Sequence, residues 1–177
     1  IGYILIALVA ENDDGIKAAS IYMFSYMIMN VAIFAILLSL KVKNEYLINI
    51  SDLKGLSKSN PIVSLSISII MLSMAGIPPF IGFFGKFYVF IAAIEQELYV
   101  LSVLGVLASV ISAFYYLRII KIMYFDESKS EGIINFQISF QSKIILFLIL
   151  CVIICFIFYP SLLINISASL TIWLMSL

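Results

Sequence analysis

One charged side chain, that of Lys86, lies deep inside an apolar stretch of the sequence. The preceding charge is Lys58 and the nearest acid is Glu95, so apolar residues flank it on both sides. A charged lysine at the centre of a transmembrane helix is unfavourable by roughly 3 kcal/mol. Deprotonating a lysine of ordinary pKa at pH 7 costs about 4–5 kcal/mol. Because the two costs are similar, a nearby charge can decide which state is present, and the residue is a candidate for proton transfer.

Lys86 has a second interpretation, as an interfacial anchor whose side chain reaches water. The apolar segment around it runs from about residue 77 to 94, which places it near the middle of the segment rather than at an end. Ionisable groups at that depth are usually functional. We therefore favour the proton-transfer role.

Helix-breaking and small residues precede and surround Lys86. Pro78, Pro79, Gly82 and Gly85 predict a broken helix, and interrupted helices inside a membrane form ion sites from the backbone groups that the break frees. The other interpretation is close helix packing, which small residues also permit. Both can hold at once.

The next apolar segment has one small and polar face, formed by Ser102, Gly105, Ser109, Ser112 and Tyr116. We interpret it first as a packing face. Its second interpretation is a polar path that holds water for proton transfer.

Asn30 is the one amide in the apolar stretch of residues 18–40. We expect it to make a hydrogen bond to another helix rather than to contact an ion directly, and we include it with Ser109, Ser112 and Tyr116 in the possible polar path.

The composition identifies a membrane protein and excludes several kinds of site. The chain is 64% apolar and 11% charged, whereas soluble domains are about half apolar and a quarter charged. It has no histidine, which excludes Ser-His catalysis, His-ligated haem and His-ligated zinc. Cys151 and Cys155 are too few for an iron–sulfur cluster. We therefore expect no cofactor and no metal in this chain. Ten basic residues balance ten acidic ones, which disfavours nucleic-acid binding.

Unbroken apolar runs separated by charged connections predict an all-α, polytopic transmembrane helical bundle. The run from Pro61 to Ile94 would be about 50 Å long as one helix, against a hydrocarbon core of about 30 Å. We therefore expect two spans that turn at Gly76–Pro79. The chain starts at Ile1 inside an apolar run, so we expect it to be the C-terminal part of a longer polypeptide. Within one membrane domain of residues 1–177, the predicted spans are 1–10 (partial), 18–40, 61–75, 77–94, 98–124 and 144–160.

Charge bias does not orient these spans. If they alternate in direction, the connection at 41–60 carries four lysines, and the opposite side carries Lys17, Arg118, Lys121, Lys129 and Lys143. Because the two sides carry nearly equal positive charge, the positive-inside rule does not assign an orientation. The apolar tail after Pro160 could span the membrane, lie on its surface or pack against a neighbouring subunit, and the sequence does not decide between these.

Three segments resemble a known family: 52–56 (DLKGL), 75–88 (AGIPPFIGFFGKFY) and 112–118 (SAFYYLR). They are similar to the subunit N family (subunit 2 in mitochondria) of the proton-pumping NADH:quinone oxidoreductases, or respiratory complex I. The resemblance covers roughly residues 1–127. It implies an antiporter-like fold in which this chain forms most of the second inverted repeat, and it puts the family's broken-helix lysine at Lys86.

The resemblance also implies a role, partner subunits and a membrane for this chain. The chain would be a translocase subunit without redox chemistry of its own, coupling quinone reduction elsewhere to proton transfer. Partner subunits would hold NADH, FMN, iron–sulfur clusters and quinone, and the membrane neighbours would be the antiporter-like subunit M and subunit K. The membrane would be the bacterial inner membrane, or the mitochondrial inner membrane. Two alternatives stay open, namely a subunit of a cation/proton antiporter or membrane-bound hydrogenase, and a structural fragment without its own pathway.

Overall fold

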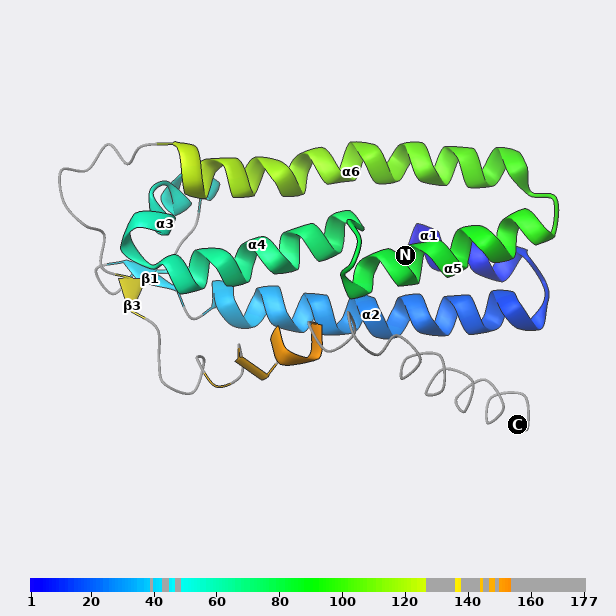
Figure 1. The fold of residues 1–177 in the computed structure, drawn as a ribbon, viewed down its shortest axis with the longest axis horizontal. Helices are drawn as coiled ribbons and strands as arrows, with labels where there is room; N and C mark the ends of the chain where they lie inside the picture. Colours follow the sequence, from blue (N-terminus) through cyan, green and yellow to red (C-terminus); the bar gives the residue numbers. More distant parts are fainter. Residues whose placement is uncertain are drawn as a thin grey trace.

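The computed structural model of the chain describes residues 1–38, 40–42, 45–46, 49–126, 136–137, 144, 147–148 and 150–153. This part of the chain is an all-α bundle, as the sequence predicts, with three two-residue strands beside one end (Figure 1). In chain order the elements are α1 (Gly2–Val9), α2 (Asp13–Leu37), β1 (Lys41–Val42), β2 (Glu45–Tyr46), a 3-10 turn η1 (Ile50–Leu53), α3 (Leu56–Ser59), α4 (Pro61–Ala75), α5 (Ile81–Glu95), α6 (Tyr99–Phe125) and β3 (Phe136–Gln137).

The two long helices, α2 and α6, have the length and apolar composition to cross a membrane. α2 begins at Asp13, before the predicted start at residue 18, because the side chain of Asn12 caps it and accepts a 2.7 Å hydrogen bond from the Gly15 amide. Asp13 and Asp14 then place negative charge in the first turn, where the helix dipole favours it. Residues 13–17, which precede the predicted span, thus belong to the helix.

The helices α4 and α5 are two halves of a single broken crossing. Figure 1 shows that both run in the same direction, with a short lateral step between them. Each has 15 residues and is therefore about 22 Å long, which is less than the hydrocarbon core of about 30 Å. The two separate spans that the sequence predicts at 61–75 and 77–94 are replaced by this one crossing. The turn between them displaces the chain sideways and does not reverse it.

The helix α2 packs along both halves of the broken crossing. One apolar cluster joins α2, α4 and α6 through residues such as Ile33, Ile67 and Met123. A second cluster joins α1, α2 and α5 through Ala7, Tyr22 and Val89. Because the clusters lie on either side of the break, packing fixes the position of each half-helix against α2.

The two ends of the bundle differ in charge. We call the end with the 49–60 connection and the last turns of α6 the basic end (Figure 1). Its described charged residues in these two segments are Asp52, Lys54, Lys58, Arg118, Lys121 and Asp126. The acidic end comprises the α1–α2 and α5–α6 turns, and its charged residues are Glu11, Asp13, Asp14, Lys17, Glu95 and Glu97. The single crossing of α4 and α5 is what brings the C-terminal end of α6 to the same end as the 49–60 connection.

The three strands form a small antiparallel sheet in the order β2-β1-β3 at the basic end. Lys41 of β1 pairs with Tyr46 on one side and with Gln137 on the other. Most of the predicted span at 144–160, and the tail after Pro160, lie outside the described residues.

Candidate functional site

Lys86 lies in the second turn of α5 and reaches back across the break to α4. Helical side chains tilt toward the N-terminus of their helix, and here that direction leads to the C-terminal end of α4. The Lys86 Nζ donates hydrogen bonds to the carbonyl oxygens of Ala75 at 2.9 Å and Met74 at 3.1 Å. The residue is only 7% exposed. Its polar head is thus turned into the bundle at the break.

The hydrogen bonds of Lys86 complete the C-terminal end of α4. The last four carbonyls of a helix have no partner within it. The amides of Gly76 and Ile77 donate to the carbonyls of Ser73 and Leu72, and Lys86 takes the remaining two. An ammonium at this position also lies at the negative end of the α4 dipole. Helix end and lysine therefore stabilise each other.

Gly76 makes room for the lysine. It ends α4 in the left-handed region, with φ +86°, which a residue with a side chain rarely adopts. A Cβ at this position would lie 2.9 Å from the Cδ and 3.2 Å from the Nζ of Lys86. The sequence marked Gly76 as a turn residue, but only the structure shows that its missing side chain is where the lysine passes.

Two further groups contact the ammonium. The Ser109 hydroxyl of α6 accepts a hydrogen bond from Nζ at 3.0 Å. The ring of Tyr3 in α1 lies with its centroid 5.3 Å from Nζ, within the range of a cation–π interaction. The candidate site therefore draws on α1, α4, α5 and α6.

Two glycines of α5 allow this helix to pack closely against α4 and α2. A Cβ on Gly82 would overlap the Ser73 carbonyl. The Gly82 amide donates to the Ser73 hydroxyl at 3.2 Å, and that hydroxyl lies 3.1 Å from the Met29 sulfur. A Cβ on Gly85 would come within 3.2 Å of the Tyr22 ring, so this glycine brings α5 close to α2. The two small residues thus serve packing, and the packing shapes the site.

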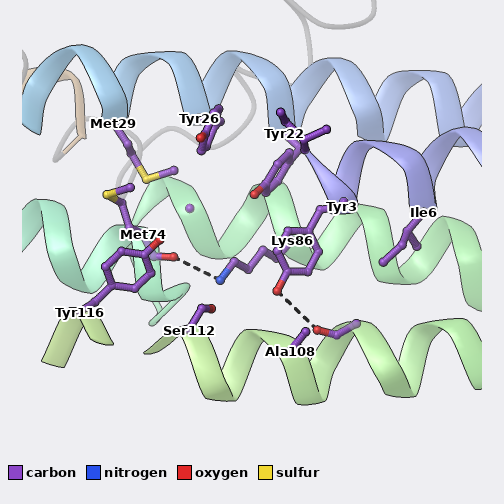
Figure 2. A pocket seen from close by; sticks show the side chains of 14 residues that line it. Tyr3, Ile6, Tyr22, Tyr26, Met29, Met74, Lys86, Ala108, Ser112 and Tyr116 are labelled. Carbon is purple, nitrogen blue, oxygen red and sulfur yellow. Dashed lines mark hydrogen bonds between the residues drawn. The ribbon is translucent and has the colours of Figure 1, made fainter. Parts of the chain in front are cut away.

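A cavity of about 410 Å³ lies beside Lys86, and tyrosines from three helices surround it (Figure 2). The Tyr3 hydroxyl donates to the Gly105 carbonyl at 3.4 Å along its edge. No acidic residue is among those that line it, which are Ile1, Gly2, Tyr3, Ile6, Tyr22, Tyr26, Met29, Met74, Gly82, Lys86, Gly105, Ala108, Ser112 and Tyr116.

The structure brings together some of the predicted polar residues and not others. Ser112 and Tyr116 line the cavity, and Ser109 contacts Lys86 directly. Asn30 is not among the lining residues, and its amide donates to the Tyr26 carbonyl at 2.8 Å within α2. One N–H of Asn30 is thus bonded inside its own helix, because a carbonyl one turn back is within reach, and the predicted bond to another helix stays a prediction.

Pro78 and Pro79 lie in the turn between α4 and α5, outside both helices. They follow Gly76, which ends α4, and they do not line the cavity.

The sequence predicted Tyr116 as part of the polar path, but the other three tyrosines of the cavity, Tyr3, Tyr22 and Tyr26, were not predicted. Tyr22 and Tyr26 are four residues apart, which puts them on one helix face. This spacing could have predicted that the two side chains lie together. Tyr3 had no such signal, because its place beside Lys86 depends on how α1 packs against α5.

Among the described residues no three Cys, Asp or Glu side chains gather as a metal site. That the chain holds no cofactor stays a prediction.

The sequence matches the profile of a family described as "NADH:quinone oxidoreductase/Mrp antiporter, TM" over residues 1–112. It is also similar to proteins named NADH-quinone oxidoreductase subunit N. The relative from Parvibaculum lavamentivorans is 51% identical over 127 residues, which are 72% of this chain and 26% of the relative. The relative from Pelagibacter ubique is 51% identical over 130 residues, which are 73% of this chain and 28% of the relative. The chain therefore spans about a quarter of the length of these curated relatives.

Solved structures share the fold. A chain of the Mrp complex from Dietzia sp. superposes with a TM-score of 0.80 at 20% identity, covering 96% of this chain and 39% of that one. A chain of respiratory complex I from Thermus thermophilus, with bound aureothin, gives a TM-score of 0.75 at 22% identity. The match covers 92% of this chain and 36% of that one. At these identities the similarity establishes the antiporter-like membrane fold alone.

Proposed function

Because the chain belongs to the NADH:quinone oxidoreductase/Mrp antiporter transmembrane family, we propose that it is a proton-translocating membrane subunit of an NADH:quinone oxidoreductase. Its relatives at 51% identity carry the name subunit N of that enzyme. In this role it couples quinone reduction elsewhere in the complex to proton transfer through Lys86. It is a multi-pass membrane protein.

The observation that carries the proposal is a buried lysine held by neutral groups. Its partners are the carbonyls of Met74 and Ala75 and the hydroxyl of Ser109, and no carboxylate is among the residues that line its cavity. An ammonium stabilised by dipoles alone keeps its charge without a fixed counter-ion. Its protonation therefore responds to any charge that changes nearby.

The size of such a response is sufficient for a proton switch. A positive charge that appears about 10 Å away raises the free energy of the ammonium by about 1.7 kcal/mol at an effective dielectric constant of about 20. This is more than a tenfold change in the protonation equilibrium. Lys86 releases its proton to water when such a charge arrives, and takes one up again when the charge is withdrawn.

The setting follows from the same family. The neighbours in the membrane are other subunits of the complex, with the antiporter-like subunit M and subunit K as the adjacent ones. This chain carries no cofactor, while NADH, FMN, iron–sulfur clusters and quinone belong to partner subunits. The membrane is the bacterial inner membrane, in keeping with the bacterial relatives.

The charged ends support one orientation. Among the described basic residues, the basic end carries Lys54, Lys58, Arg118 and Lys121, whereas the acidic end carries Lys17 alone. Lysine and arginine accumulate on the cytoplasmic side of membrane proteins. The basic end therefore faces the cytoplasm.

The test is the substitution Lys86→Ala in the assembled complex. We expect fewer protons translocated per NADH oxidised in membrane vesicles, at an unchanged content of assembled complex. The control Lys58→Ala removes an exposed lysine at the basic end and should leave the ratio unchanged. A normal ratio in Lys86→Ala would overturn the proposal. Purification with cation/proton antiporter subunits, and without a flavin and iron–sulfur arm, would assign the chain to an antiporter instead.

A further inference from the structure

The three hydrogen bonds of Lys86 match the needs of its charged form. An ammonium has three N–H groups and no acceptor. The carbonyls of Met74 and Ala75 accept two of them, and the hydroxyl of Ser109 accepts the third. Every donor of the protonated lysine is thus satisfied within 3.1 Å.

The neutral form has different needs. An amine has two N–H groups and one lone pair, so it must accept one hydrogen bond. The two carbonyls cannot donate, and the face of the Tyr3 ring attracts a cation rather than donating a proton. Among the described groups that contact Nζ, only the Ser109 hydroxyl can reverse from acceptor to donor, since the hydroxyl of Tyr3 is turned to the Gly105 carbonyl.

We propose that Ser109 is a positioning residue that holds Lys86 at the helix break in both protonation states. Its hydroxyl accepts a hydrogen bond from the ammonium and, after rotating about its Cβ–Oγ bond, donates one to the neutral amine. When the lysine loses a proton, the Ser109 hydroxyl turns aside and a water takes its place at the third N–H and accepts that proton. The hydroxyl then returns as the donor to the lone pair of the amine, so Ser109 itself gains and loses no proton. This inference rests on the proposed role of Lys86 in proton transfer.

Its position in the fold suits Ser109 to this task. The residue belongs to α6, whereas Lys86 and its two carbonyl partners belong to the broken crossing. The contact therefore ties the lysine to a separate, continuous helix. A lysine kept in place while neutral needs no side-chain movement before it is protonated again. Without the hydroxyl, each protonation state has one unsatisfied group and the lysine is free to leave the break.

The experiment compares Ser109→Val with Ser109→Thr in the assembled complex. The two replacements have nearly the same shape, and only threonine keeps a hydroxyl. We expect Ser109→Thr to retain proton pumping and Ser109→Val to reduce it at least tenfold per assembled complex, the factor that corresponds to about 1.4 kcal/mol. Assembly is measured separately, from the content of the chain in the purified complex.

The matched control is Ser102, on the same face of α6 and 5% exposed, whose hydroxyl donates to the Leu98 carbonyl in its own helix. Ser102→Val and Ser102→Thr should pump equally. Equal pumping by Ser109→Val and Ser109→Thr would overturn the inference, while the loss in Lys86→Ala would leave the proposed function standing. If Lys86→Ala pumps normally, the proposed function fails first, whatever Ser109 does. Should Ser109→Val fail to assemble, Ser109→Ala replaces it in the same comparison, and full pumping by that variant overturns the inference.

Discussion

The ammonium of Lys86 in α5 donates a 2.9 Å hydrogen bond to the carbonyl of Ala75, the last residue of α4. This bond joins the two half-helices at the point where the backbone ladder is interrupted. It also sets a positive charge on the negative end of the α4 dipole. The break and the lysine are therefore one structural unit, and disturbing either should disturb the other.

Gly76→Ala should impair proton pumping by displacing Lys86. The new Cβ would stand 2.9 Å from the lysine Cδ, and the left-handed backbone disfavours any side chain by about 1–2 kcal/mol. We expect fewer protons translocated per NADH oxidised, measured in vesicles at matched content of the complex.

The control for this change is Gly2→Ala, because a Cβ on Gly2 meets no described atom within 4 Å. It should pump as the unaltered chain does. Normal pumping by Gly76→Ala would mean that the lysine can reach its carbonyls by another path.

Ser73→Ala should weaken the broken crossing. It leaves the buried Gly82 amide without its 3.2 Å partner, and an unsatisfied buried donor costs about 1–3 kcal/mol. The expected result is a lower midpoint temperature for thermal unfolding of the purified complex, or a lower content of this chain in the membrane.

Ser64→Ala is the matched comparison in the same helix. Its hydroxyl is fully buried, and among the described residues it has no hydrogen-bond partner, so its removal should be neutral or stabilising. Equal losses from the Ser73 and Ser64 substitutions would show that the bond to Gly82 contributes nothing measurable.

Single cysteines should report the one crossing made by α4 and α5. Ser51, before α4, and Gln96, after α5, are both exposed. After Cys151 and Cys155 are replaced, Ser51→Cys and Gln96→Cys should react with a membrane-impermeant thiol reagent from opposite sides of the membrane. Ser51→Cys should react from the cytoplasmic side. Reaction of both from one side would mean two crossings and would contradict the fold.

Much of the candidate site could be predicted from residue types. Lys86 stands out because a charge near the middle of an apolar run is costly, whereas one near its end can reach water. Gly82 and Gly85 stand out because small residues at one-turn spacing allow helices to approach. Asn30 donates to a carbonyl of its own helix, which shows that a local acceptor competes with distant ones, and its bond to another helix stays a prediction. Tyr3 was missed, because no local pattern tells which side chains a helix from another part of the chain will bring.

The sequence by itself determined the membrane class, the all-α fold and the one buried charge. These follow from the transfer free energies of residue types, which need no knowledge of neighbours. Only the tertiary structure decided that Pro61 to Glu95 crosses once, because the direction of the chain after Gly76 depends on packing against α2. The single crossing also brings Lys54, Lys58, Arg118 and Lys121 to the same end of the bundle. From the sequence alone, the two sides of the membrane carried nearly equal numbers of basic residues. The partners of Lys86 were decided by the tertiary structure too, since hydrogen bonds from a buried group go to whatever acceptors the fold places within about 3 Å.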